Sequence, residues 1–86
     1  MTFEDMVKTA ASRKKDGPAD SSTAALLKKG AHAIGKKLVE EAAESWMAAR
    51  FESKDQLALE LSQVLYYVAV MMADKGVSID EVYKKL

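Results

Sequence analysis

The sequence has no cysteine and only one proline and four glycines among its 86 residues. Without cysteine no disulfide can form, so a chain this short must gain stability from a packed core, a metal or a partner. The absence of thiols also suits the cytoplasm. The 13 basic and 13 acidic residues cancel, whereas a general nucleic-acid-binding protein normally carries a basic excess. We therefore expect a cytoplasmic protein that binds no nucleic acid.

Long apolar runs are also missing. Residues 1–10 are acidic and apolar but lack the continuous hydrophobic stretch of a signal peptide. The longest apolar run, residues 64–73, is shorter than the roughly 20 residues that a transmembrane helix needs. This pattern predicts a protein without a membrane segment, in which the run forms a helix buried between other helices.

Apolar residues recur at helical spacing along the whole chain, which predicts a single all-α domain over residues 1–86. A first helix is expected over residues 3–15, followed by a loop that contains the only proline. Ser21 or Ser22 would then cap a long second helix. Glycine weakens that helix in its middle, so we expect a kink or short break near Gly30.

Residues 53–56 have the form of a capping box and predict a third helix, which ends where Gly76 supplies a stop. A second capping box at residues 78–81 predicts a short final helix. The loop between the two long helices is short, which favours an antiparallel hairpin. Both long helices have broad apolar arcs that two short helices cannot cover. The simplest remedy is a homodimer in which two hairpins form a four-helix bundle.

Three glutamates, Glu40, Glu41 and Glu44, crowd into five positions of the second long helix. Like charges four residues apart destabilise an isolated helix by roughly 0.2–0.5 kcal/mol. Either this face is simply solvated, or a cation neutralises it.

A second polar stripe lies on the third helix, where Glu60, Gln63 and Tyr67 follow each other at spacings of three and four residues. Antiparallel packing would bring this stripe to the same edge of the seam as the three glutamates. Carboxylates from facing helices of a bundle can hold divalent metals, and Mg²⁺ prefers such oxygen ligands. The pattern therefore indicates a metal site, with a solvated helix face as the competing interpretation.

Several short motifs occur in a fixed order along the chain. They are Ser-x-Thr at residues 21–23, Lys36-Lys37-x-x-Glu40-Glu41-x-x-Glu44, then Glu60 and Leu65-Tyr66, and the ending Gly76-x-Ser78-x-Asp80-x-Val82. With these motifs, the chain from Phe3 to Leu86 resembles the phosphoribosyl-ATP pyrophosphatase family, within the MazG-like superfamily of all-α nucleotide pyrophosphatases. The resemblance implies Mg²⁺-dependent hydrolysis of phosphoribosyl-ATP to phosphoribosyl-AMP and pyrophosphate in histidine biosynthesis.

The resemblance also implies roles for individual residues. The metal ligands would be Glu40, Glu41, Glu44, Glu60 and Gln63. The candidates for contacting the substrate phosphates are Lys36, Lys37, Ser21, Ser22, Thr23 and Arg13, with Lys28 or Lys29 in addition. The chemistry of such a hydrolysis indicates Glu41 or Glu44 as the group that takes the proton from the attacking water. Tyr67 shares the stripe of Glu60 and Gln63, which indicates a hydrogen bond within the site.

Three positions depart from the family pattern. Gln63 stands where the family has aspartate, Tyr67 where it has histidine, and Ser22 where it has tyrosine. Glutamine offers a neutral carbonyl oxygen and no charge, so binding of a second Mg²⁺ should be weaker. The number of metal ions is therefore left open by the sequence.

Each candidate also has a purely structural interpretation. The hydroxyl residues at 21–23 can act as helix caps, and the paired lysines can form ion pairs with the glutamates one turn later. His32 belongs to no motif and is expected on the surface. Trp46 and Tyr66 are expected in the core or a dimer interface, not as a platform for adenine.

Two other functions stay open at this point. A housekeeping nucleoside triphosphate pyrophosphatase of the same superfamily would share the metal motif. A helical dimerisation module that has lost activity would also fit, and Gln63 is the residue that favours it.

Overall fold

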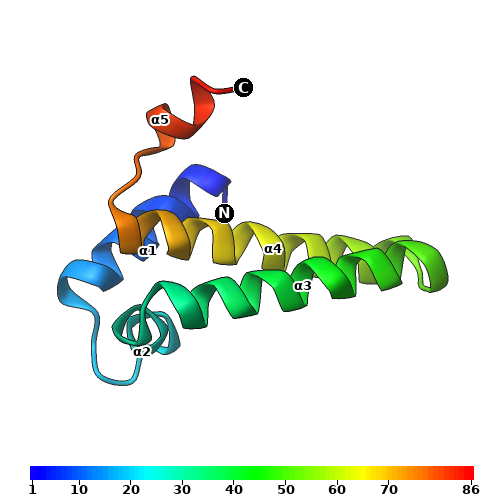
Figure 1. The fold of residues 1–86 in the computed structure, drawn as a ribbon, viewed down its shortest axis with the longest axis horizontal. Helices are drawn as coiled ribbons and strands as arrows, with labels where there is room; N and C mark the ends of the chain where they lie inside the picture. The colour runs from blue at the N-terminus through cyan, green and yellow to red at the C-terminus, as the bar shows by residue number, and fades with distance from the viewer.

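All 86 residues are described by the computed structural model, which is all-α as predicted and has no strand (Figure 1). The chain forms five helices: α1 (Phe3–Asp16), α2 (Ser22–Lys29), α3 (Ala31–Phe51), α4 (Lys54–Lys75) and α5 (Ile79–Tyr83).

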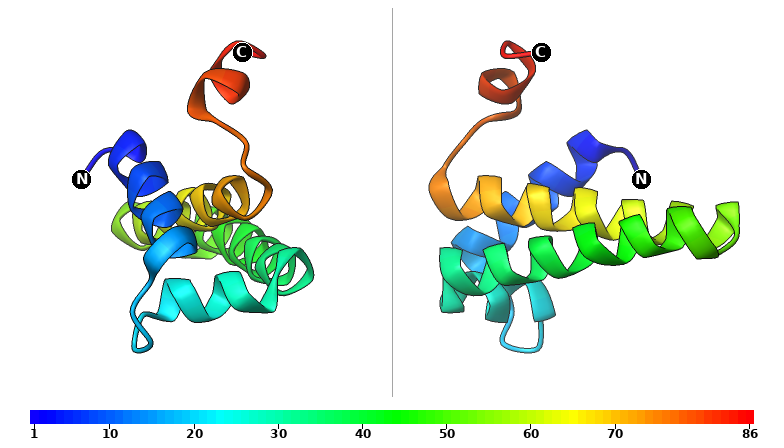
Figure 2. Two further views of the ribbon diagram at one scale, coloured as in Figure 1. Left: turned by 90° about the vertical axis from the view of Figure 1, so that its left-hand side faces the viewer. Right: turned by 45° about the vertical axis from the view of Figure 1, so that its right-hand side comes forward.

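The two longest helices, α3 and α4, form the predicted antiparallel hairpin, joined through only two residues at its tip (Figure 1). Helix α1 crosses α4, and α2 runs across the start of α3 (Figure 2). The central core takes one buried apolar residue from each of these four helices: Ala10, Leu27, Ile34 and Val70. Tyr66 packs against this cluster, so its predicted place at the core is confirmed.

The prediction of one long second helix is wrong. This part of the chain forms two helices, α2 and α3, that run in different directions. They meet at Gly30, whose φ of 90° and ψ of −172° interrupt the helix. An L-residue with a side chain rarely adopts such a conformation, whereas glycine does so at little cost. The expected break near Gly30 is thus confirmed, and it frees α2 to cross the hairpin.

The helix caps follow the sequence with one exception. Ser21 caps α2 by accepting a hydrogen bond from the backbone N–H of Ala24, and residues 78–81 form a complete capping box. At the start of α4, the hydroxyl of Ser53 accepts from the backbone N–H of Gln56 as expected. The reciprocal bond predicted for that box is wrong, because the Gln56 side chain donates to Glu60 instead.

An apolar face of the hairpin lies open in the single chain. Val39 and Trp46 on α3 are each 69% exposed, and Leu61 and Leu65 on α4 are 48% and 47% exposed. At about 100° per residue, these side chains lie on one side of the hairpin. The expectation that residues 64–73 are buried between helices therefore holds for Val70 and fails for Leu65 in the isolated chain.

By length and composition, α4 is apolar enough to cross a membrane, a criterion that core helices of soluble proteins also meet. Only 17% of its most apolar window is buried within the chain. The apolar run at residues 64–73 is shorter than a membrane span, but the helix that contains it continues over 22 residues.

Replacing Gly30 by alanine should lower the free energy of unfolding by about 1–3 kcal/mol, the usual cost of a strained backbone conformation. No atom lies within 4 Å of the added Cβ, so the effect is purely conformational. Gly35→Ala is the matched control, since Gly35 is helical and its added Cβ would lie 3.7 Å from Met71 Cε. That variant should gain roughly 0.5–1 kcal/mol.

Chemical denaturation followed by circular dichroism measures both values. A Gly30→Ala variant as stable as the parent would contradict the role given to the positive φ.

Candidate metal and phosphate site

Three carboxylates meet where α3 and α4 face each other. Glu41 and Glu44 lie one turn apart on α3, Glu60 comes from α4, and one oxygen from each lies within 4.8 Å of the others. Opposite ligands of an octahedral Mg²⁺ lie about 4.2 Å apart. Small side-chain rotations would therefore bring one oxygen of each glutamate within reach of a single ion. The structure thus brings together three of the five residues for which a metal role was predicted.

Two oxygens in this cluster are buried and accept no hydrogen bond, Glu41 Oε2 and Glu60 Oε2. A buried carboxylate oxygen without a donor is costly. The pKa of Glu41 is raised, first by burial and then by the charges of Glu44 and Glu60. A divalent cation would relieve both the missing partners and the repulsion, so this set of donors fits a metal with oxygen ligands.

Gln56 is a residue that the sequence analysis assigned only to a helix cap. Its Nε2 donates to Glu60 Oε1 at 3.2 Å, while Oε2 of the same carboxylate has no partner. The signal in the sequence was the spacing of four residues between Gln56 and Glu60, which places both on one helix face. The bond orients the carboxylate, as groups behind metal ligands commonly do.

Glu40 and Lys36 point away from the cluster. Glu40 forms an ion pair with Lys37 at 3.7 Å, and both side chains are about half exposed. Lys36 lines a separate shallow hollow together with His32, which is exposed as expected.

A cavity of about 500 Å³ lies between α2 and the hairpin. Its polar lining consists of Ser22, Lys29, Lys37, Gln63, Tyr66 and Tyr67. A hydrogen bond between the hydroxyls of Thr23 and Tyr66 ties α2 to α4 beside it. Burial raises the pKa of Tyr67, Lys37 lowers it in part, and Glu41 raises it further. Tyr67 therefore lines the cavity on the same face of α4 as Glu60, and its support of the site through a hydrogen bond stays a prediction.

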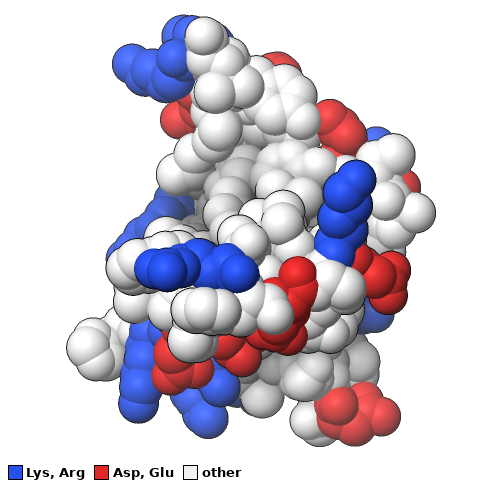
Figure 3. All heavy atoms as spheres, turned by 90° about the vertical axis from the view of Figure 1, so that its right-hand side faces the viewer, with Lys and Arg blue, Asp and Glu red and all other residues white.

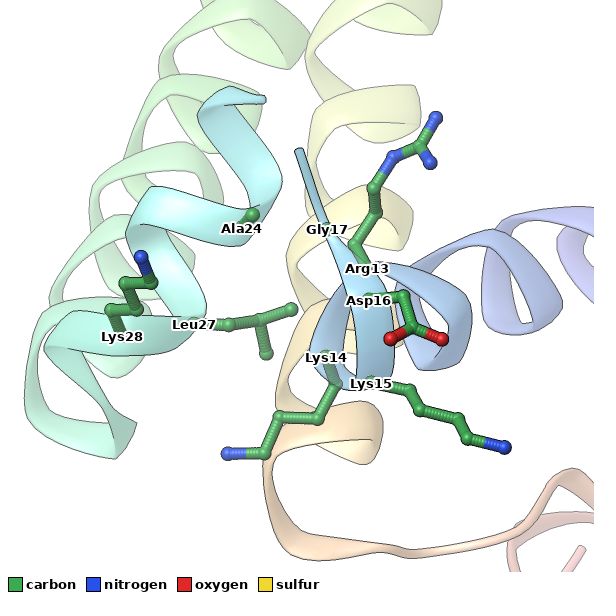
Figure 4. A pocket seen from close by; sticks show the side chains of 8 residues that line it. All are labelled: Arg13, Lys14, Lys15, Asp16, Gly17, Ala24, Leu27 and Lys28. Atoms are coloured by element: carbon green, nitrogen blue, oxygen red, sulfur yellow. The ribbon is translucent and has the colours of Figure 1, made fainter. Parts of the chain in front are cut away.

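Arg13 belongs to another region. It lines a cavity of about 200 Å³ between α1 and α2, together with Lys14, Lys15 and Lys28 (Figure 4). In that view the cationic side chains spread in different directions and do not converge on one point. Lys14 is bound to Asp74 at 3.4 Å.

The surface at the hairpin tip shows acidic and basic side chains interspersed, with much uncharged surface between them (Figure 3). No large patch of a single sign covers this face.

Comparison with known proteins agrees with the geometry. The family model described as phosphoribosyl-ATP pyrophosphohydrolase matches residues 3–86. A phosphoribosyl-ATP pyrophosphatase from Streptomyces coelicolor is 55% identical over 86 residues, which cover 99% of this chain and 96% of that protein. Another from Streptomyces avermitilis is 54% identical with the same coverage.

Replacing Glu41 by glutamine should stabilise the metal-free chain at neutral pH. Relief of about 0.5 kcal/mol of like-charge repulsion would raise the melting temperature by roughly 2–4 °C. Because the folded pKa of Glu41 is raised above its usual value of 4.5, the folded chain binds more protons than the unfolded chain just above that pH. The contribution of this carboxyl to the free energy of unfolding is therefore complete below pH 4.5. That contribution is lost as the pH rises through the folded pKa.

Melting curves in EDTA at several pH values test this prediction. Glu52→Gln is the control, because Glu52 is exposed at the hairpin tip and lies outside the carboxylate cluster, so no stabilisation is expected there. Equal melting temperatures for Glu41→Gln and the parent at pH 7 would refute the repulsion.

Proposed function

The chain belongs to the phosphoribosyl-ATP pyrophosphohydrolase family, and on this premise we propose how it hydrolyses its substrate. It is a hydrolase of histidine biosynthesis that converts phosphoribosyl-ATP to phosphoribosyl-AMP and pyrophosphate. We propose that Mg²⁺ held by Glu41, Glu44 and Glu60 serves this reaction beside a phosphate-binding cavity. The observation that carries the proposal is the cluster of three carboxylates with two buried, unpartnered oxygens.

The remaining predicted ligands have lesser roles in this proposal. Glu40 would have to leave Lys37 before it could reach the cluster. Gln63 lines the adjacent cavity and offers a neutral carbonyl oxygen in place of the family's aspartate. Three carboxylates suit one resident Mg²⁺ with several waters retained, so we propose one tightly held ion.

The chemistry is a displacement at the α-phosphorus. The oxygen of a water molecule forms the new bond to phosphorus, and the bond from phosphorus to the α–β bridging oxygen breaks. Its electron pair leaves with pyrophosphate, and Glu41 or Glu44 accepts the proton of the water. Bound Mg²⁺ supplies charge neutralisation at the phosphate oxygens and makes water a better nucleophile.

Substrate phosphates are held by the residues around the 500 Å³ cavity. Lys37 and the hydroxyl of Ser22 line it, and Thr23 lies beside it through its bond to Tyr66. Free backbone N–H groups at the start of α2 favour an anion there, while the Ser21 hydroxyl is occupied as the cap. Arg13 and Lys36 line other hollows, so we leave them out of the phosphate site.

We also propose that the enzyme is a cytoplasmic homodimer. The apolar face defined by Val39, Trp46, Leu61 and Leu65 consists of large side chains that are 47–69% exposed, and grouped exposed apolar side chains of this kind mark interaction surfaces. A second copy of the hairpin packed on this face would give a four-helix bundle. The same contact would cover α4, which accounts for its apolar character without a membrane.

Pyrophosphate release from phosphoribosyl-ATP should require both Mg²⁺ and Glu41. The parent should turn over with Mg²⁺ and stop in excess EDTA. Glu41→Gln should lose more than about 100-fold in rate, beyond the 10- to 100-fold typical of changes behind metal ligands. Glu52→Gln, at the exposed hairpin tip, is the control and should keep full activity.

A folded parent that releases no pyrophosphate would overturn the catalytic proposal and favour a dimerisation module. Turnover of plain nucleoside triphosphates in preference to phosphoribosyl-ATP would favour a housekeeping pyrophosphatase.

A charge placed on the apolar face should separate the dimer. Leu65→Lys is expected to sediment as a monomer at concentrations where the parent is a dimer, because burying an unpaired lysine is costly. Ala11→Lys, at an exposed position of α1 and outside the apolar face of the hairpin, should remain dimeric. Analytical ultracentrifugation distinguishes these cases, and a monomeric parent at all concentrations would refute the dimer.

A further inference from the structure

Two pairs of adjacent lysines are divided between different surfaces. Lys29 and Lys37 both line the 500 Å³ cavity between α2 and the hairpin. Their neighbours face elsewhere: Lys28 lines the cavity shared with Arg13, and Lys36 lines the hollow on the outer side of α3. Adjacent residues on a helix point about 100° apart, so only one lysine of each pair can face the cavity.

The lining of this cavity is suited to a strongly negative ligand. It contains two ammonium groups, an amide, a serine hydroxyl and two phenols, and it contains no carboxylate. Lys29 has no ion-pair partner, because the two ion pairs in the chain join Lys14 to Asp74 and Lys37 to Glu40. An exposed pair such as Lys37–Glu40 holds its lysine only weakly, so both ammonium groups are available to an anion.

The cavity adjoins the carboxylate cluster along the hairpin. Lys37 precedes Glu41 by four residues on α3, and Gln63 follows Glu60 by three residues on α4, so each is about one turn, roughly 5.4 Å, from the cluster. Gln63 and Tyr67 both line the cavity and follow Glu60 by three and seven residues on one face of α4, so this face leads from the carboxylates into the cavity. The cavity is therefore on the α2 side of the carboxylates.

Beyond the carboxylates, toward the hairpin tip, the surface changes character. Phe51 lies seven residues after Glu44, on the same face of α3, and is 75% exposed. Met47 lies between them along the chain and is also exposed. This direction offers apolar surface to a flat base, whereas the α2 side offers ammonium groups to phosphates.

We propose that the cavity between α2 and the hairpin binds the β- and γ-phosphates, which leave as pyrophosphate, and that Lys29 is a ligand of this group. The proposal rests on the function proposed above. It gives the substrate a direction: the triphosphate end points to α2, the α-phosphate lies at the carboxylates, and the phosphoribosyl-adenine end points to the hairpin tip.

Product inhibition and direct binding test the proposal. For Lys29→Met, the inhibition constant of inorganic pyrophosphate with Mg²⁺ should rise about 10-fold or more, as expected for loss of a charge-assisted bond. The inhibition constant of phosphoribosyl-AMP should change less than about twofold, because that product lies beyond the carboxylates. Turnover is followed by chromatography of phosphoribosyl-AMP, and calorimetry of inorganic pyrophosphate with Mg²⁺ gives a readout independent of turnover.

Lys28→Met is the matched control, since it removes the same charge one residue away and outside the cavity. It should leave both inhibition constants within about twofold of the parent. Lys29→Arg should restore most of the pyrophosphate affinity, and circular dichroism checks that every variant is folded.

Equal pyrophosphate affinities for Lys29→Met and Lys28→Met would overturn the assignment. So would equal losses for both products, which would indicate only a general effect of charge. Failure of the proposed function can be told apart from failure of this assignment, because only the former shows as a parent without turnover. In that case calorimetry still decides whether Lys29 binds pyrophosphate.

Discussion

The packing of α3 against α4 is the interaction on which the site depends, because it holds negative charges together that would otherwise separate. Glu41, Glu44 and Glu60 repel one another, and two of their oxygens are buried without a donor. Burial of Ile34 and Val70 in the same hairpin supplies the apolar free energy that opposes this repulsion. The chain without metal is thus less stable than its core would allow, and under the proposed function a bound cation would offset this repulsion.

Much of this arrangement could be predicted from the sequence, because helical spacing fixes which residues share a face. The hairpin, its caps and the approach of Glu60 to Glu41 and Glu44 all follow from that spacing. Spacing does not fix the angle at which two helices cross once a glycine separates them. The direction of α2 could therefore not be predicted, nor could the cavity that each of Lys28, Lys29 and Arg13 lines. The side-chain bond from Gln56 to Glu60 could not be predicted, because a glutamine at this position can bond either the cap backbone or a residue one turn later.

The two sides of the hairpin have different tasks. One side carries the carboxylates, the lysines and the tyrosines, and α2 covers part of it. The other side is apolar and, in the isolated chain, uncovered. When one side of the longest helices of a small protein is polar, a single chain has less apolar surface to bury in its core. A second chain would supply the missing burial, and in the proposed dimer association and catalysis would draw on opposite faces of the same two helices.

The two-residue connection at the hairpin tip has a consequence for how the length of such a chain can change. Glu44 and Glu60 each lie about two turns from this connection, on opposite arms. A residue inserted within either arm would turn its carboxylate by about 100° and advance it by about 1.5 Å, which would break up the cluster. Added residues in the connection itself would leave both faces aligned. Insertions and deletions should therefore be tolerated at the tip and rejected in the arms between it and the carboxylates.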